Sequence, residues 1–271
     1  MKKALIGFCN NVIVHKEKID LWIKSFKKFC DHDIVLLVAN ATNEDINFCN
    51  DLNIICKYYN VDYTHQINHK RLYYIHNYLT ECNYDILLST DVFDVIFQSD
   101  PFSKLDTNNF DIFVSGEGLD ICHEPWNYDN INKLFPQEIN KCKNYEVINS
   151  GVIAGKRLSL INLYKRMFEL CENSNNNHDI KDQAALIVMV YNNEIPKLKI
   201  FTLDDAWAMH CAVAGPTSFF DAWGFRNNIK YGIPKIKNRV VISKNNDIYD
   251  IVHQFNRIPE WHQTLKTVLY E

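Results

Sequence analysis

The first ninety residues alternate between short apolar runs and segments with helical spacing, and this alternation limits the fold more than any other feature. Apolar runs predict strands at residues 4–8, 33–39, 53–59 and 85–89. Between them, apolar residues repeat every three or four positions, which predicts helices around residues 19–26, 44–52 and 69–82. Strands that alternate with helices pair in parallel, with helices on both faces of the sheet. The sequence therefore predicts an α/β fold with a mostly parallel central sheet.

The second half of the chain is less regular. Strands are predicted at residues 109–115, 146–155, 200–203 and 240–243, and helices at residues 158–171, 181–191 and 259–270. No internal repeat and no linker rich in proline, glycine or serine divides the sequence. Because 271 residues are enough to bury a large core, we expect one continuous domain over residues 1–271.

Composition excludes several classes of partner. A net charge of -4 gives no general attraction for nucleic acid or for an anionic membrane. No run of 18 apolar residues is present, so we expect no transmembrane segment. The N-terminus superficially resembles a signal peptide, but Asn10 and Asn11 interrupt its apolar run and no cleavage site follows. The nine cysteines form no CxxC pair, which is typical of free thiols in a reducing compartment, and we expect a cytoplasmic protein.

Two carboxylates follow the fourth predicted strand directly. Asp91 and Asp94 lie in the stretch TDVFDVIFQSDPF, at the carboxyl end of a parallel strand, where ligands of such sheets bind. A carboxylate beside a buried strand needs water, a proton or a cation to offset its desolvation. Their spacing can bring both side chains onto one ion, and oxygen ligands suit Mg²⁺ or Mn²⁺. Alternatively, the two aspartates cap a turn.

Four short motifs in a fixed order resemble those of nucleotide-sugar glycosyltransferases of the GT-A fold. The D-x-x-D pattern is similar to the metal motif in the glycosyltransferase domain of lysyl hydroxylases. INSGVIAGKR, residues 148–157, is similar to the N-[AS]-G-V strand of GT8-like enzymes, and DQAAL, residues 182–186, to their D-Q helix start. VHQFNR, residues 252–257, places a histidine where these enzymes supply a third metal ligand, although their usual Gly and Lys-Pro-Trp ending is replaced. The resemblance covers residues 1–257.

The resemblance implies a single GT-A domain, with a nucleotide-binding half at residues 1–100 and an acceptor half at residues 101–271. It implies that Asp91, Asp94 and His253 hold Mn²⁺ or Mg²⁺ and that the diphosphate of a UDP-sugar donor completes the coordination. Sugar transfer releases a nucleoside diphosphate, whose growing charge a metal neutralises. Arg257 and Lys156 are candidate partners of that diphosphate, or alternatively ordinary surface cations.

Nucleotide selection is expected from the loop at residues 9–11 and from the third helix, which carries Lys70 and Arg71. Asn10 can offer its amide to the uracil edge, or it is simply a turn residue. Phe93, which lies between the two aspartates, packs on the ribose or base, or else in the core.

Donor-sugar contacts follow from the two central motifs. By resemblance, Asn149 and Ser150 touch the donor sugar; the alternative is that they shape a strand bulge before Gly151. Asp182 and Gln183 would face the sugar and the reaction centre as catalytic residues, although Asp182 could equally cap its helix.

Other side chains are candidates for acid–base chemistry and for acceptor binding. Glu117 is a second candidate acid or base. Four tryptophans can stack on sugars or pack in the core, namely Trp126, Trp207, Trp223 and Trp261. Trp223 is the preferred acceptor contact because it lies in a predicted loop.

The predicted function is metal-dependent transfer of a sugar from a UDP-sugar to a glycan or protein acceptor, by a monomer or a homo-oligomer. One alternative is a phosphatase of the haloacid-dehalogenase type, whose D-x-D-x-[TV] aspartates normally follow the first strand rather than the fourth. The other is an inactive relative that only binds a nucleotide or glycan. The presence of all three proposed metal ligands favours activity.

Overall fold

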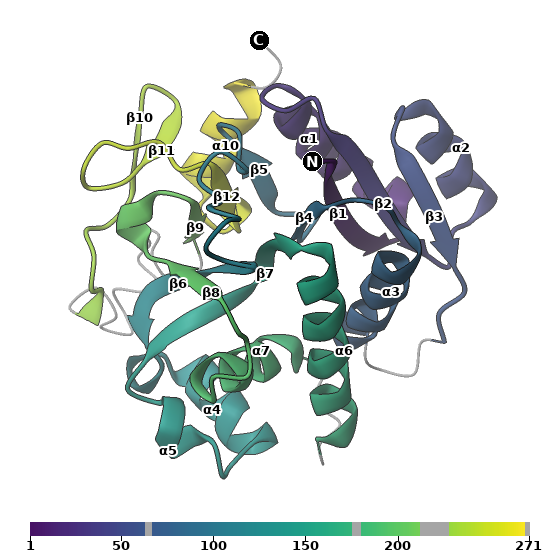
Figure 1. Cartoon of the computed structure of the whole chain (residues 1–271). Helices are drawn as coiled ribbons and strands as arrows, with labels where there is room; N and C mark the ends of the chain where they lie inside the picture. Colours follow the sequence, from purple (N-terminus) through teal and green to yellow (C-terminus); the bar gives the residue numbers. More distant parts are fainter. Residues whose placement is uncertain (63–66, 175–179, 212–227, 269–271) are drawn as a thin grey trace.

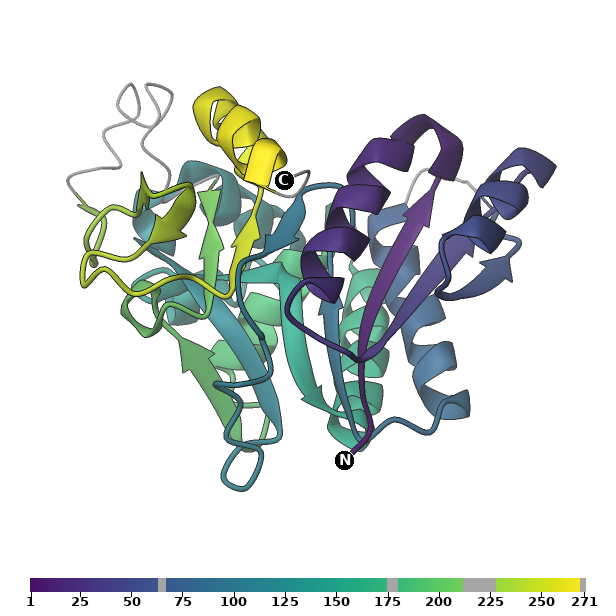
Figure 2. The same cartoon turned by 90° about the horizontal axis from the view of Figure 1, so that it is seen from above.

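The computed structural model describes residues 1–62, 67–174, 180–211 and 228–268. These residues form an α/β structure in which helices cover both faces of a central sheet (Figures 1 and 2). Trp223 lies outside the described residues, so its predicted acceptor contact stays a prediction.

Within the described residues, the central sheet contains seven strands. They are β1 (Lys3–Asn10), β2 (Asp33–Ala39), β3 (Ile55–Tyr59), β4 (Ile86–Thr90), β6 (Ile112–Asp120), β7 (Glu146–Lys156) and β8 (Leu198–Phe201). Their order is β3-β2-β1-β4-β7-β6-β8. Only β7 runs antiparallel to its neighbours β4 and β6, while the remaining pairs are parallel. The predicted mostly parallel sheet is therefore confirmed.

Two layers of helices sandwich this sheet (Figures 1 and 2). One layer contains α3 (Ile67–Glu81), α4 (Pro125–Leu134), α5 (Ile139–Cys142), α6 (Arg157–Asn173) and α7 (Asp182–Tyr191). The other contains α1 (Lys16–Lys27) and α2 (Asn43–Asp51). Successive side chains of a strand point to opposite faces, so Ala4 and Ile6 pack with the first layer and Leu5 with the second.

A small second sheet lies beside the α1 layer. Its strands are β5 (Val95–Phe97), β9 (Ala208–His210) and β12 (Ile251–His253). They pair in the order β5-β12-β9, with β12 antiparallel to β5 and parallel to β9. This sheet brings residues near the C-terminus next to the segment that follows β4 (Figure 2).

The rest of the described chain consists of a hairpin and short helices. These elements are β10 (Lys235–Lys237), β11 (Val240–Ile242), η1 (Val12–His15), η2 (Ile121–His123), η3 (Leu203–Asp205), η5 (Phe255–Arg257) and α10 (Pro259–Val268). Helix α10 returns to α1, where Lys266 pairs with Glu17 at 3.8 Å.

The principal predicted strands and helices are present, but helices α4 and α5 were not predicted. The other differences concern short elements. The predicted strand at residues 240–243 is β11, which belongs to the hairpin rather than to the central sheet. Strands β5, β9 and β12 were not predicted as strands, because three residues are too few to show a period. Within the described ranges, none of the helices has the length and apolar character needed to cross a bilayer.

Candidate metal centre

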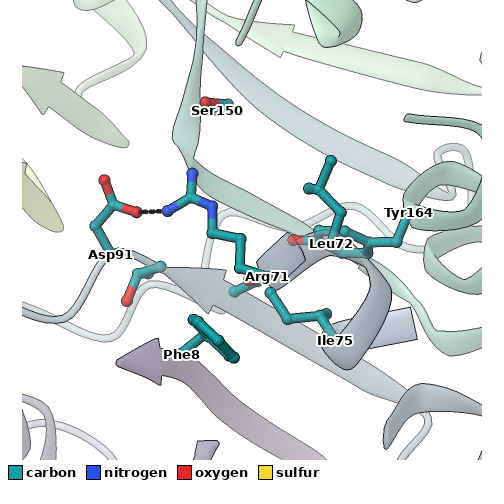
Figure 3. A pocket seen from close by; sticks show the side chains of 9 residues that line it. Phe8, Arg71, Leu72, Ile75, Asp91, Ser150 and Tyr164 are labelled. Carbon is teal, nitrogen blue, oxygen red and sulfur yellow. Dashed lines mark hydrogen bonds and ion pairs between the residues drawn. The ribbon is translucent and has the colours of Figure 1, made fainter. Parts of the chain in front are cut away.

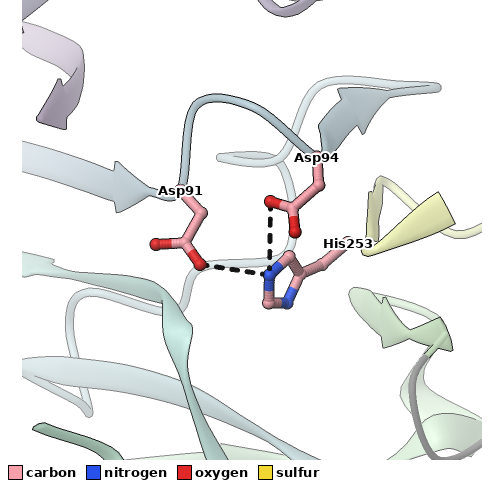
Figure 4. A group of neighbouring side chains, drawn as sticks. All are labelled: Asp91, Asp94 and His253. Atoms are coloured by element: carbon pink, nitrogen blue, oxygen red, sulfur yellow. Dashed lines mark ion pairs between the residues drawn. The ribbon is translucent and has the colours of Figure 1, made fainter. Parts of the chain in front are cut away.

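Two segments, the loop after β4 and strand β12, place two aspartates and a histidine together beyond the end of β4 (Figure 4). The loop that carries both aspartates is fixed at each end by the backbone. The amide of Asp91 donates to the carbonyl of Gly151 at 2.9 Å, and the amide of Gln254 donates to the carbonyl of Asp94 at 2.6 Å. Pairing of β12 with β5 places His253 opposite Val95, one residue after Asp94. Strand register therefore brings the histidine to the carboxylates.

The ligand atoms are close enough to share one ion. His253 Nε2 lies 3.2 Å from Asp91 Oδ2 and 3.6 Å from Asp94 Oδ1, and the ring points toward both carboxylates in Figure 4. One ligand atom from each residue lies within 4.8 Å of the others. His253 Nε2 is buried, and these two carboxylates are its neighbours among the described residues. Two carboxylates and one imidazole fit Mn²⁺ or Mg²⁺.

Gly151 keeps the cluster open on the β7 side. A Cβ atom at this position would lie 2.5 Å from His253 Cε1, 2.8 Å from His253 Nε2 and 2.9 Å from Asp91 Oδ2. Any side chain here would displace the imidazole or the carboxylate. The glycine of the INSGV motif is therefore required for space.

Arg71 and His253 bring positive charge to the two carboxylates of the cluster. Burial by itself would raise the pKa of Asp91, but the charges of Arg71 and His253 outweigh burial and hold this pKa well below its usual range. Burial raises the pKa of Asp94 against the opposing charge of His253. Burial lowers the pKa of His253, but the charges of Asp94 and Asp91 outweigh it and the net shift is upward.

Arg71 of α3 joins Asp91 to Asp182. Its guanidinium donates to Asp91 Oδ1 and, at 2.5 Å, to Asp182 Oδ2. In Figure 3 the guanidinium points at Asp91 across a cavity that Ser150 and Tyr164 also line. This cavity encloses about 10 Å³, room for about one water molecule and too little for a sugar ring. The guanidinium of Arg71 is therefore bonded to the carboxylates of Asp91 and Asp182 in this structure.

A break in the register of β7 brings Ser150 close to Asp182. The pairing of β6 with β7 shifts between Val114 and Ser115, which is the bulge that one alternative predicted before Gly151. Ser150 Oγ lies 3.4 Å from Asp182 Oδ2, to which it donates. Asp182 is the first helical residue of α7, and the N-cap position belongs to Lys181, so the alternative that Asp182 is the N-cap is wrong.

A buried polar network extends from the bulge to α4. Asn149 Nδ2 donates to Glu117 Oε1 at 2.6 Å, and Gln183 Nε2 donates to Asn127 Oδ1 at 2.9 Å and to Glu117 Oε1 at 3.4 Å. Asn127 Nδ2 in turn donates to Glu124 Oε2 at 2.7 Å. Burial raises the pKa of Glu117 to about 7. Glu117 is thus a carboxyl group that changes its charge near neutral pH.

A second histidine lies behind the first. His210 is fully buried, and its Nδ1 lies 2.9 Å from Nδ1 of His253. Burial, reinforced by the charge of His253, holds the pKa of His210 well below its usual value. The Nε2 of His210 lies 2.6 Å from Ser115 Oγ.

The remaining nucleotide candidates lie at the edge of the cluster or away from it. Phe93 packs against His15, with ring centroids 4.3 Å apart, as expected for its core alternative. Asn10 is the last residue of β1, so the predicted loop at residues 9–11 begins later than expected. Arg257 is exposed in η5, and its charge acts on Asp94. Lys70 donates to Glu172 at 3.2 Å.

Two sets of candidates are misplaced. Lys156 pairs in register with Ile86, the first residue of β4, so it lies at the opposite end of the sheet and cannot contact a diphosphate at Asp91. Trp207 and Trp261 are buried core residues, because Trp207 is inaccessible and Trp261 only 4% exposed. Trp126 is 45% exposed, as an acceptor platform requires.

Sequence reasoning missed four polar residues of the site, namely Ser115, Glu124, Asn127 and His210. None belongs to one of the four motifs, and none lies near a motif residue in the sequence. The stretch HEPWN carried one usable signal, because an acidic residue directly before a proline can begin a helix. The sequence held no comparable signal for His210.

Solved structures share this architecture. The crystal structure of the galactosyltransferase LgtC with donor and acceptor sugar analogues aligns with a TM-score of 0.59 at 12% identity, over 97% of this chain and 95% of that chain. An LgtC active-site mutant, in which glutamate replaces a glutamine, aligns with a TM-score of 0.58 at 11% identity over the same shares. A scan against protein-family models and a search of curated proteins find no match. The chain therefore has the predicted GT-A fold, and the likeness to lysyl hydroxylases stays a prediction.

Proposed function

We propose that this protein is a metal-dependent glycosyltransferase that uses a UDP-sugar donor. The observation that carries the proposal is the convergence of Asp91, Asp94 and His253 on one point beyond β4, within a GT-A fold. In open sheets with parallel strands, ligands bind at the carboxyl ends of the strands, where this cluster lies. LgtC, which has the same fold, is a galactosyltransferase crystallised with donor and acceptor sugar analogues.

Asp91, Asp94 and His253 would hold Mn²⁺, or Mg²⁺ in its place. When bound, the ion would supply positive charge for the diphosphate that leaves the sugar. The buried Nε2 of His253, which faces both carboxylates, and the space kept by Gly151 support this assignment. Exposed Arg257 would add a second positive charge beside Asp94.

The residues on the other side of the cluster would orient the donor sugar. Asp182 and Ser150 meet at 3.4 Å, and Gln183 accepts from the amide of Ser150 at 3.3 Å. Arg71 fixes Asp182 relative to Asp91, so the sugar contacts and the metal ligands form one rigid unit. The Asn149 amide is already bonded at both ends, to Glu117 and Gly151, so we assign it a structural role beside the sugar.

The remaining predictions form part of the same proposal. Residues 1–100 would bind the nucleotide, with Asn10, Arg71 and Phe93 near it, and residues 101–271 would bind a glycan or protein acceptor, with Trp223 as one contact. All nine cysteines are free thiols, which supports a reducing, cytoplasmic location.

Titration calorimetry tests the proposal with UDP in the presence and absence of Mn²⁺. We expect UDP to bind at least tenfold more tightly with Mn²⁺, and Asp91→Asn and Asp94→Asn to abolish this difference. Asp51→Asn, which changes an exposed carboxylate at the end of α2, is the matched control and should bind like the parent.

Turnover with a panel of UDP-sugars then separates the alternatives. Metal-dependent release of UDP from one donor supports the glycosyltransferase. Phosphate release from simple phosphoesters without any nucleotide sugar would favour the phosphatase. Tight binding of UDP with no turnover of any donor would favour the inactive relative.

A further inference from the structure

His210 and His253 are register partners on adjacent parallel strands. Pairing of β12 with β9 sets the two residues opposite each other, so their side chains lie on the same face of the small sheet. Their rings are almost perpendicular, at 88°, with centroids 5.1 Å apart. The two Nδ1 atoms lie 2.9 Å apart, which is hydrogen-bond distance.

The contact continues to the central sheet. His210 Nε2 lies 2.6 Å from the hydroxyl of Ser115 in β6. Ser115 and His210 are fully buried and His253 is 2% exposed, so water does not compete for these bonds. A continuous line of hydrogen bonds therefore runs from Ser115 through His210 to His253, whose Nε2 faces Asp91 and Asp94.

When His253 binds a cation, only one placement of the ring protons allows both hydrogen bonds, from His253 to His210 and from His210 to Ser115. A metal-binding Nε2 carries no proton, so the single ring proton of neutral His253 lies on Nδ1. That proton points at His210 Nδ1, which must then accept it. The proton of His210 consequently lies on Nε2 and is donated to Ser115 Oγ.

We propose that His210 is a positioning residue that holds His253 in the tautomer and orientation required for metal binding. A metal-bound histidine usually donates its second nitrogen to a carboxylate, a backbone carbonyl or water, and loss of such a partner commonly weakens metal binding 10–100-fold. Here a second imidazole takes that place, so the ligand is oriented without another negative charge beside Asp91 and Asp94. The inference rests on the proposed function only in assigning a metal ion to the cluster.

Two substitutions at His210, whose side chains have the same shape, test whether its Nδ1 acts as a hydrogen-bond acceptor. In His210→Asn, the side-chain oxygen replaces Nδ1 as acceptor, whereas His210→Leu has the same branched shape and accepts nothing. We expect the leucine variant to bind Mn²⁺ about 10–100-fold more weakly than the parent, and the asparagine variant to lie within about threefold of it, by calorimetry. Equal Mn²⁺ affinity of the two variants, whether strong or weak, would overturn the proposal.

The tautomer itself gives a readout that needs neither metal nor activity. In the metal-free parent, ¹⁵N spectra of histidine side chains should show neutral His210 with its proton on Nε2 and a bare Nδ1 that accepts from His253 Nδ1. A proton on His210 Nδ1 would overturn the assignment even if the leucine variant fails to fold. If the parent binds no Mn²⁺, the proposed function fails, while this spectrum still decides the role of His210.

Discussion

At the residue scale, the polar groups of the candidate site are shared rather than independent. Glu117 Oε1 accepts from Asn149 and from Gln183, and Gln183 also donates to Asn127. Buried polar groups linked in this way depend on one another, because each lost partner leaves another atom without a bond. The charge of Glu117 therefore affects the whole network.

Glu117→Gln should change the pH dependence of stability. Burial raises the folded-state pKa from the ordinary value of 4.5 to about 7, so the protonated carboxyl stabilises the fold below pH 4.5. This stabilisation amounts to about 3 kcal/mol, and it is lost as the pH rises from 4.5 to about 7. We expect the variant to gain about 3 kcal/mol relative to the parent between pH 4.5 and pH 7.5, measured by urea unfolding. The same difference at both pH values would contradict the assignment.

Gly151→Ala should close the candidate metal centre. Its Cβ would lie 2.5 Å from His253 Cε1, so the imidazole must move from its ligand position. We expect Mn²⁺ affinity to fall at least tenfold and stability to fall by about 1–3 kcal/mol, as in overpacked interiors. Calorimetry and thermal unfolding measure the two effects.

Gly155→Ala is the matched control, since it crowds the same strand far from the metal centre. Its Cβ would lie 2.6 Å from the carbonyl oxygen of Asp111. We expect lower stability but unchanged Mn²⁺ affinity. Equal loss of Mn²⁺ affinity in both variants would show that crowding acts through general destabilisation.

At the element scale, the small sheet of β5, β12 and β9 determines where His253 lies. A three-residue strand has little stability of its own, so other contacts must hold it. Gln98, directly after β5, donates to the carbonyls of Val241 and Tyr249 at 3.1 and 2.9 Å and accepts from the amide of Val241 at 2.7 Å. This buried side chain ties β5 to β11 and to the segment that leads into β12.

Gln98→Leu should destabilise this assembly. The substitution removes the side-chain partner of the amide of Val241 and of the carbonyl of Tyr249, and we expect a loss of about 2–4 kcal/mol in denaturant unfolding. Gln137→Leu, at an exposed position after α4, is the control and should change stability by at most about 0.5 kcal/mol. A Gln98 variant as stable as the Gln137 variant would rule out this role.

At the scale of the whole molecule, the candidate metal centre joins distant parts of the chain. Asp91 and Asp94 follow the fourth strand of the central sheet, whereas His253 lies on the last strand of the chain. An ion held by all three would link the central sheet to the small sheet. An ion that binds only the folded state stabilises it according to its concentration and affinity.

Mn²⁺ should therefore stabilise the parent against unfolding. At 100 times its dissociation constant, the expected gain is about 2.7 kcal/mol, measured by thermal unfolding. Asp94→Asn should lose this gain but be no less stable than the parent without Mn²⁺, because burial disfavours the charge of Asp94. Equal stabilisation of parent and variant would remove Asp94 from the ligand set.

The local pattern of the sequence determined the fold class and the position of the acidic pair. Apolar runs and helical spacing depend on neighbouring residues, so the alternation up to residue 90 was enough to predict the parallel sheet and to place Asp91 and Asp94 at its carboxyl edge. Recurring motifs added Asp182, Gln183 and His253, which the structure places around the same point.

Only the tertiary structure decided which side chains meet. Arg71 bonds Asp91 and Asp182 because α3 packs against α7. His210 reaches His253 because the register of β9 and β12 sets the two residues opposite each other. Lys156 shows the converse, since it belongs to a motif, as the last residue of β7, and yet lies at the opposite end of the sheet from Asp91. Register depends on contacts between segments distant in sequence, and their short strands carry no periodic signal.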